Sequence, residues 1–317
     1  MLSVRNLSID YLYGVRAITD ASFYVQENEK LAVLAPPGGG KTTLFKCLAG
    51  LLKPTAGECS LSGNNIYAIK PNARNIVAIG KNNWFLKHQT VTHALEYPLK
   101  LRKIPHDKRK QLVLQAAHDF RILPLLNDLI SQLYQDDVIR LAFARASLRN
   151  PDLFLIDDVF STLTNQRSES FFELLPFMKS INAPLVFTTS SPDEAFTLCD
   201  QTVIMNFGIT HQIGTPTEIL STPQTLFVDK LVHPFNSVQQ IDENDSQYFM
   251  SCQYVESDSG TTLVVKDVIY NAGTAYAIFD NNIKLRLETL PPKQIYTIAI
   301  KSGSQSFYAY STEKRRT

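Results

Sequence analysis

Residues Leu31–Gly50 read LAVLAPPGGGKTTLFKCLAG, and this stretch decides the fold. Its first four residues, Leu31–Leu34, form the short apolar run that is typical of a buried parallel strand, and Thr42–Leu52 has helical spacing. The glycines between them allow backbone N–H groups to turn inward around phosphate oxygens, and the helix N-terminus behind the loop adds its positive dipole end. The stretch therefore predicts a strand, a phosphate-binding loop and a helix, in preference to an ordinary glycine-rich turn.

The polar residues at the end of this loop favour the same interpretation. Lys41 is placed to reach the outer phosphates of a nucleotide, and Thr42 to reach a magnesium ion. The pattern GxxxxGK[ST] is incomplete because Ala35 replaces its first glycine; if that position needs a positive φ, alanine would cost about 1–2 kcal/mol. The residues of the loop that we expect to bind the nucleotide are Gly38, Gly39, Gly40, Lys41, Thr42 and Thr43.

A second polar anchor follows another apolar run, Leu153–Ile156, which ends in Asp157 and Asp158. A carboxylate at the end of a buried strand can orient Mg²⁺ through water, so we expect Asp157 to serve the metal together with Thr42. Two such anchors in one doubly wound sheet place phosphate and metal at the same edge. The sequence therefore predicts an α/β P-loop fold that binds a nucleotide with Mg²⁺.

Composition excludes several other classes of protein. The chain has 317 residues, 44% of them hydrophobic, which allows one large domain and a small one. Lys and Arg number 31 against 30 Asp and Glu, so no basic face for nucleic acid is predicted. The N-terminal stretch alternates like a strand, and no apolar run is long enough to span a membrane. The four cysteines are scattered without a CxxC pair, which favours reduced thiols that pack in the core.

The order of segments resembles an ATP-binding-cassette (ABC) ATPase over about residues 1–232. After the phosphate loop, TVTHALEYPLKLRKIPHDKRKQLV resembles the start of the family's helical subdomain, which we expect at about residues 85–150. RLAFARASLRNPDLFLIDDVFSTL resembles the helix and strand that end in the Walker B acid, and DEAFTLCDQTVIMNFGITHQIGTPTEIL the closing segment. The resemblance implies ATP and Mg²⁺ as cofactors, a membrane permease as partner, and a cytoplasmic location at the inner face of the membrane.

The C-terminal part predicts a separate all-β fold. TPTEILSTPQTLFVDKLVHPFNSV is similar to the exit from the ATPase domain in importers of the maltose and spermidine–iron type, which carry a small β domain behind it. Residues 239–317 contain alternating stretches such as TTLVVKDVIY and IYTIAIKSG between turn residues. We expect five or so short strands here, forming a small barrel or sandwich.

Four positions depart from the pattern of the family where it carries chemistry. Asp158 stands in place of the glutamate that polarises the attacking water, and Ser190 in place of the histidine that contacts the γ-phosphate. Lys81 aligns with the glutamine that senses magnesium, and Thr164 with the aspartate of the loop after Walker B. Loss of a placed general base typically costs about 10²–10⁴ in rate. We therefore expect Asp158 to be a weak substitute and hydrolysis to be impaired.

The family signature LSGGQ, which holds the γ-phosphate of ATP on the opposite subunit, reads Leu133–Asp137, LYQDD. Two aspartates without a glycine are expected to repel phosphate and to block close backbone approach. No glycine occurs between Gly80 and Gly208, so a shifted alignment supplies no glycine pair. Because both halves of a sandwich dimer are affected, the resemblance implies a heterodimer with an intact second ABC ATPase.

Aromatic residues provide two further candidates. Tyr13 matches the residue that stacks on adenine in the family, with Tyr11 as the alternative on the same face of a strand and a plain core tyrosine as the competing interpretation. Trp84 and Phe85 lie where the family contacts the permease, although packing within the helical subdomain accounts for them equally well.

We therefore predict a degenerate, ATP-binding subunit of a membrane transporter, in particular a sugar-type solute importer, that acts with a competent ATPase and a permease. Two other functions stay open on the sequence alone. One is a working transport ATPase that uses Asp158 as its base. The other is a regulatory or scaffolding protein that acts outside transport through its β tail.

Overall fold

The computed structural model describes residues 1–317 with the exception of 12–13, 71–72, 82–84, 164–166, 235, 244–245, 272–273, 280–282, 288–294 and 310–317. The chain divides into two compact units, Met1–Thr215 and Pro216–Thr317. We expected a nucleotide-binding domain at 1–232 and a β domain at 239–317. These bounds describe how far the resemblance to the family extends, so they stay a prediction.

The first unit is built on a ten-stranded sheet with the order β5-β4-β1-β2-β10-β9-β3-β8-β7-β6. Five neighbouring strands run parallel, namely β9 (Gln201–Asn206), β3 (Lys30–Leu34), β8 (Leu185–Thr189), β7 (Leu153–Asp157) and β6 (Ile76–Gly80). Strands β7 and β8 are buried along their whole length, which explains their nearly continuous apolar sequence. The predicted strands at 31–34 and 153–156 are thereby confirmed.

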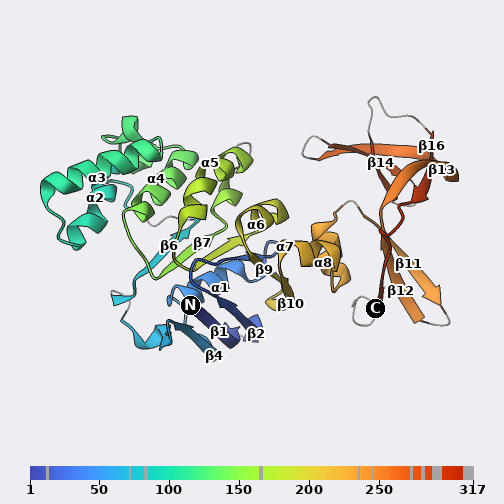
Figure 1. The fold of residues 1–317 in the computed structure, drawn as a ribbon, viewed down its shortest axis with the longest axis horizontal. Coiled ribbons are helices and arrows are strands. Elements are labelled where there is room, and N and C mark those ends of the chain that lie inside the picture. Colours follow the sequence, from blue (N-terminus) through green and yellow to red (C-terminus); the bar gives the residue numbers. More distant parts are fainter. Residues whose placement is uncertain are drawn as a thin grey trace. The chain divides into compact units, whose positions relative to one another are not determined.

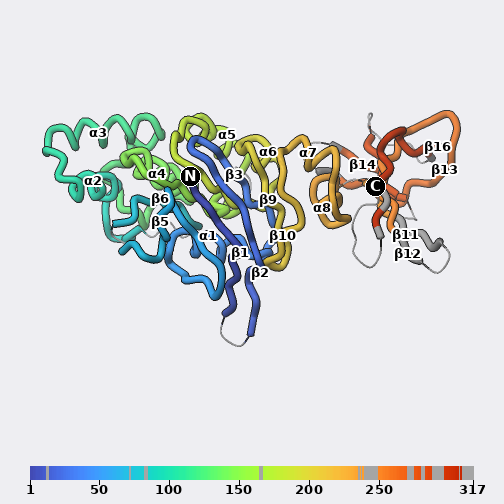
Figure 2. The backbone as a smooth tube through the Cα atoms, turned by 60° about the horizontal axis from the view of Figure 1, so that its bottom comes forward, coloured from blue at the N-terminus to red at the C-terminus, as the bar shows by residue number. Residues whose placement is uncertain are grey.

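The other half of this sheet is mainly antiparallel, with one parallel pairing that joins its C-terminal strand to the N-terminal ones. It contains β1 (Leu2–Asp10), β2 (Arg16–Val25), β4 (Ala56–Leu61), β5 (Asn64–Asn65) and β10 (Ile209–Gly214). Strand β1 pairs with β2 on one side and with β4 on the other, and β1 and β2 run side by side in the tube view (Figure 2). The turn from β9 to β10 reaches the phosphate loop, because the Gly208 N–H donates to the Gly39 carbonyl at 3.2 Å.

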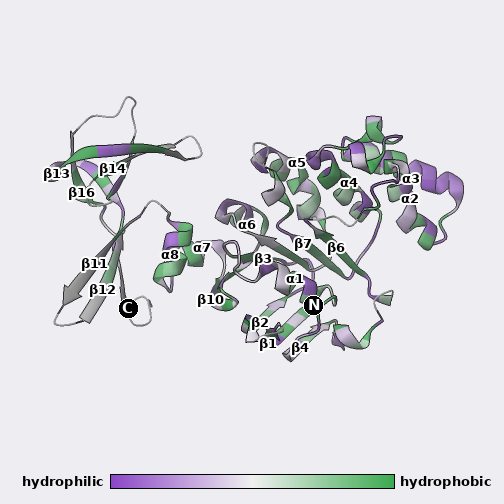
Figure 3. Cartoon of the chain, turned by 180° about the vertical axis from the view of Figure 1, so that it is seen from behind, coloured by the Kyte–Doolittle hydropathy of each residue, from purple (hydrophilic) through white to green (hydrophobic). Residues whose placement is uncertain are grey.

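Three helices form a group of their own at one end of the unit (Figure 1). They are α2 (Val91–Leu101), α3 (His106–Asp119) and α4 (Gln135–Ser147), all within the region where a helical subdomain was expected. Helix α3 is mostly hydrophilic, whereas the strands of the central sheet are largely hydrophobic (Figure 3). The remaining helices of the unit are α1 (Lys41–Leu48), α5 (Arg167–Ser180) and α6 (Pro192–Leu198).

The second unit begins with two short helices, α7 (Pro216–Ser221) and α8 (Leu226–Val232). Its strands form a three-stranded sheet, β11-β12-β17, and a four-stranded sheet, β14-β15-β13-β16. Their bounds are Ser237–Glu243, Ser246–Cys252, Tyr254–Asn271, Thr274–Phe279, Lys284–Arg286, Ile295–Ile300 and Ser306–Ala309 for β11 to β17. The predicted C-terminal β fold is thus confirmed, with a hydrophobic core that includes Phe279, Leu285 and Ile298.

Two expectations drawn from composition can be compared with the structure. All four cysteines are buried and free, as predicted for reduced thiols that pack in the core. Within the part of the chain that the structure describes, no helix combines the length and apolar character needed to cross a membrane.

Candidate functional site

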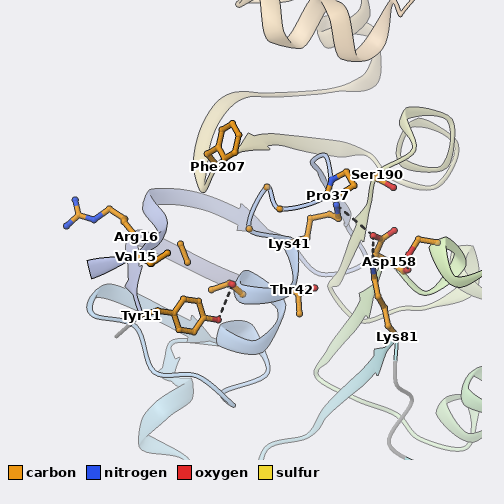
Figure 4. A pocket seen from close by; sticks show the side chains of 16 residues that line it. Tyr11, Val15, Arg16, Pro37, Lys41, Thr42, Lys81, Asp158, Ser190 and Phe207 are labelled. Carbon is orange, nitrogen blue, oxygen red and sulfur yellow. Dashed lines mark hydrogen bonds and ion pairs between the residues drawn. The ribbon is translucent and has the colours of Figure 1, made fainter. Parts of the chain in front are cut away.

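A cavity of about 670 Å³ lies at the carboxyl edge of the parallel strands, around the phosphate loop. Eight of the predicted site residues line it, namely Gly38, Gly39, Gly40, Lys41, Thr42, Thr43, Asp158 and Ser190. The rest of the lining consists of Tyr11, Val15, Arg16, Ala17, Pro37, Lys81, Ser161 and Phe207. Figure 4 shows these side chains converging from several elements. Of the other predicted residues, Asp157 is hydrogen-bonded to Thr42 at the wall of the cavity, and Tyr13 lies outside the described residues.

The backbone of the loop has the conformation that its glycines allow. Gly38 and Gly40 have φ values of +80° and +102°, in the left-handed region. A Cβ on Gly39 would lie 2.7 Å from the Cβ of Ala35, so the methyl group of Ala35 requires glycine opposite it. Ala35 itself is not among the described residues with positive φ, and the strain that was considered for it does not arise.

Lys41 starts helix α1 and is almost completely buried, with 6% of its surface exposed. Its ammonium donates to the carbonyl oxygens of Ala35 at 2.5 Å and Pro36 at 3.1 Å, which holds the side chain along the loop. Burial lowers the pKa of Lys41, while the nearby Asp158 carboxylate raises it. The ammonium is therefore fixed at the floor of the cavity, where it can face the phosphates of a nucleotide.

Thr42 and Asp157 form the predicted metal pair. The Thr42 hydroxyl donates to Asp157 Oδ2 at 3.0 Å, and the Thr188 hydroxyl donates to Asp157 Oδ1 at 2.8 Å. Burial raises the pKa of Asp157, and these two hydrogen bonds oppose that shift. A hydroxyl beside a carboxylate is an all-oxygen donor set, which suits Mg²⁺. The residues present therefore fit the metal that the phosphate loop implies.

Asp158, the residue in the position of the general base, is held between two lysines (Figure 4). Its Oδ2 lies 3.1 Å from Lys81 Nζ and 3.8 Å from Lys41 Nζ. Its backbone N–H donates to the Thr188 carbonyl at 2.9 Å, and its φ of +46° is rare for a residue with a side chain. Oδ1 is buried and has no hydrogen-bond partner among the described residues. One carboxylate oxygen is thus charge-paired and the other is unpartnered.

Ser190 follows strand β8 and lines the cavity, in the position where the family has its histidine. Beside it lies a buried polar network that the sequence analysis missed. Arg167 Nε donates to Glu194 Oε1 at 2.6 Å, and Thr189 hydrogen-bonds the other oxygen of Glu194. Arg and Glu are 27 positions apart, so only the tertiary structure brings them together. This network supports the segment that carries Ser190.

The aromatic wall of the cavity includes Tyr11 and Phe207. The Tyr11 hydroxyl lies 3.2 Å from Thr43 Oγ1, which fixes the ring at the loop helix, so the alternative residue for adenine contact is present in the cavity. Phe207, in the β9–β10 turn, was not predicted; it is 77% exposed and has a φ of +45°. A bulky, exposed residue with a positive φ marks a candidate functional position. The sequence alone shows neither the exposure nor the φ of Phe207.

Helix α4 begins at Gln135, within Leu133–Asp137, the stretch that we expect to stand in place of the family signature. Tyr134 precedes its first residue and is 83% exposed. Asp136 accepts hydrogen bonds from the Ser170 hydroxyl at 2.5 Å and pairs with Arg140 at 2.7 Å. Asp136 is therefore a paired carboxylate, although Arg140 also pairs with Glu173 at 2.9 Å, and the repulsion of phosphate stays a prediction. Burial raises the pKa of the adjacent Asp137.

Three predicted positions remain, and the structure describes one of them. Thr164 and Trp84 lie outside the described residues. Phe85 is half-buried, and the Arg145 guanidinium lies over its ring at 4.6 Å from the centroid. This contact matches the packing role that was considered for Phe85, and the permease contact stays a prediction.

The family described as ABC transporter matches residues 18–161. An sn-glycerol-3-phosphate import ATP-binding protein, UgpC of Bartonella quintana (strain Toulouse), is 33% identical over 229 residues, which cover 72% of this chain and 66% of that protein. A spermidine/putrescine import ATP-binding protein, PotA of Borrelia garinii subsp. bavariensis, is 32% identical over 238 residues, 74% of this chain and 69% of that protein.

Solved structures agree on the fold. The ATP binding subunit of an ABC transporter matches with a TM-score of 0.61 and 22% identity, over 69% of this chain and 91% of that one. The protein cbiO1 of Clostridium perfringens matches with a TM-score of 0.61 and 23% identity, over 69% and 89% of the two chains. The chain spans about two thirds of the length of its glycerol-3-phosphate relatives. The phosphate loop, the sheet order and these relatives lead to one conclusion: the chain belongs to the ABC transporter family of ATP-binding proteins.

Proposed function

We propose that this chain is the nucleotide-binding subunit of an ABC importer, and that it holds Mg²⁺-ATP but hydrolyses it slowly or not at all. The observation that carries the proposal is the ion pair between Asp158 and Lys81, with Nζ and Oδ2 3.1 Å apart. A carboxylate oxygen that faces an ammonium at this distance is engaged by that side chain and is not free to orient an attacking water.

The residues would divide the work of binding as follows. The N–H groups of Gly38–Gly40 and the Lys41 ammonium would hold the phosphates, and Tyr11 or Tyr13 would face the base. Thr42 and Asp157 would hold Mg²⁺, which neutralises phosphate charge when it is bound. Ser190 lacks the ring nitrogen of the family's histidine, so a further contribution of about 10²–10³ in rate is absent. Binding is supported by these contacts, whereas turnover is not.

Partners and location follow from the same proposal. The relatives are named as import ATP-binding proteins, and we propose that this chain acts with membrane permease subunits at the cytoplasmic face, in the uptake of a small polar solute of the sugar type. We also propose a second, competent ABC ATPase as partner, because LYQDD at 133–137 has no glycine with which to cover a neighbour's phosphate.

The experiment is incubation of the full chain with labelled Mg²⁺-ATP, followed by identification of the retained nucleotide. Native protein should retain ATP intact, Lys41→Ala should lose it, and Lys46→Ala, an exposed lysine on the same helix, should behave as native. Steady release of ADP by native protein, abolished in Asp158→Asn, would instead establish the working ATPase that uses Asp158 as its base.

A further inference from the structure

The position of Lys81 in the cavity is set by strand pairing. Strand β6 ends at Gly80 and pairs in parallel with β7, with Gly80 opposite Asp157. The next residue of each strand, Lys81 and Asp158, therefore leaves the sheet at the same level and faces the phosphate loop. The two side chains meet in the structure, with Nζ and Oδ2 3.1 Å apart.

The charged side chains nearest the phosphate loop balance one another. Lys41 and Lys81 face Asp157 and Asp158, so the four side chains sum to zero. Arg16, which also lines the cavity, is engaged by Asp10 at 2.9 Å. With glutamine at position 81 the same set would carry one net negative charge and would depend on a divalent cation to accept a triphosphate. The ammonium of Lys81 supplies part of the positive charge that a divalent cation would otherwise supply.

The contacts leave Lys81 free to bind phosphate without breaking its pair. The Lys81 ammonium carries three N–H donors, and Asp158 approaches it as an ion-pair partner with Nζ and Oδ2 3.1 Å apart. The Lys81 side chain is 41% exposed at the cavity, whereas that of Asp158 is 5% exposed. Ser161 holds the backbone of Asp158 in place. The backbone carbonyl of Asp158 accepts hydrogen bonds from the N–H and the hydroxyl of Ser161, at 3.2 and 2.6 Å. The buried carboxylate thus orients an accessible ammonium.

We propose that Lys81, oriented by Asp158, is a binding residue for the outermost phosphate of a nucleoside triphosphate and makes triphosphate binding largely independent of Mg²⁺. In this arrangement Asp158 is a positioning residue for Lys81. The inference rests on the proposed function, since it concerns the same nucleotide cavity. It adds a specificity: the site distinguishes ATP from ADP through a side-chain cation, because a diphosphate has no group at that place.

The test measures equilibrium binding of ATP and ADP to the full chain, each with Mg²⁺ and with EDTA. Native protein should bind ATP in EDTA within about tenfold of its affinity in Mg²⁺, and Lys81→Gln should weaken ATP binding in EDTA by about tenfold or more, or about 1.4 kcal/mol. Lys81→Gln should change the affinity for ATP in Mg²⁺, and the affinity for ADP with or without Mg²⁺, by less than about threefold. A change of that size is too small to reflect the loss of a charge-assisted contact.

Two variants separate a phosphate contact from a structural effect. Lys81→Arg keeps the charge and should retain most of the ATP affinity in EDTA. Lys87→Gln, an exposed lysine that does not line the cavity, should leave all four affinities unchanged. Unchanged thermal unfolding of each variant without nucleotide shows that the fold is kept.

The contrary outcomes are distinct. An equal loss for ATP and ADP in Lys81→Gln overturns the contact of Lys81 with the outermost phosphate. An equal loss of ATP affinity with and without Mg²⁺ overturns the role of Lys81 in making binding independent of the metal. Native binding of ATP in Mg²⁺ that disappears in EDTA overturns this inference and leaves the proposed function standing. No binding of ATP by native protein in either condition overturns both.

Discussion

Ala35 and Gly39 are packed against each other inside the phosphate loop. The family pattern has glycine at the first of these positions, and the methyl group of Ala35 fills the space where a side chain at 39 would lie. Because the distance to a built Cβ is 2.7 Å, the loop keeps its shape only while position 39 has no side chain. The substitution at 35 is therefore accommodated by its neighbour and not by backbone strain.

Gly39→Ala should destabilise the first unit by about 1–3 kcal/mol through overpacking, and should weaken nucleotide binding. Ala35→Gly alone should be nearly neutral for binding. In the double variant Ala35→Gly/Gly39→Ala, part of the loss should be recovered, although the Pro36 carbonyl would still lie 3.0 Å from the new Cβ. Urea unfolding and ATP titration measure the coupling. An identical cost of Gly39→Ala in both backgrounds would contradict this packing argument.

At the level of elements, helix α8 is tied to strand β17 by a buried polar centre. The Tyr308 hydroxyl donates to Asp229 Oδ2 at 2.9 Å, and His233 Nδ1 lies 2.9 Å from Asp229 Oδ1. Burial raises the pKa of Asp229, but hydrogen bonds from His233, Ser251 and Tyr308 together lower it below its ordinary value. A lowered folded-state pKa means that the ionised carboxylate stabilises this unit above pH 3.8 and that this contribution is lost as the pH falls through the lowered value.

Tyr308→Phe removes one hydrogen bond to this carboxylate and leaves the ring in place. We expect a cost of about 1.5–3 kcal/mol at neutral pH, because hydrogen bonds to charged groups contribute that much. The cost should shrink as acid protonates Asp229. Urea unfolding at a series of pH values, followed by hydrogen exchange in the β11–β17 strands, provides the measurement. The exposed Tyr24→Phe is the control, and a cost that does not vary with pH would show that Asp229 is not the partner that matters.

At the level of the whole molecule, the chain has two compact units with separate cores, and the proposed nucleotide cavity belongs to the first. A ligand that binds only the folded form stabilises the cooperative unit to which it binds. The two units are therefore expected to respond differently to ATP, whatever the role of the second in transport.

ATP at 100 times its Kd should protect the slowest-exchanging amides of residues 1–215 by up to about 2.7 kcal/mol and leave those of 216–317 unchanged. Hydrogen exchange with mass spectrometry on the full chain measures both sets in one experiment. Lys41→Ala with the same ATP should show no protection in either unit. Equal protection of both units would show that they unfold as one.

The sequence by itself determined the local features of this protein. Apolar runs followed by Gly38–Gly40 and Asp157 predicted the central strands and the phosphate loop, because strand, loop and helix are set by neighbouring residues. Alternation within residues 239–317 predicted a C-terminal β fold in the same way.

Only the tertiary structure decided which charges meet. Lys81 and Asp158 are far apart in the chain, and they pair because β6 lies beside β7 in a register that no local pattern specifies. Tertiary packing likewise brings the Ser170 hydroxyl of α5 to Asp136 and brings Phe207 of the β9–β10 turn to the cavity, whereas the pair of Asp136 with Arg140 is a local i,i+4 contact within α4. Periodicity specifies how each segment folds, whereas the sheet order determines which side chains share a site.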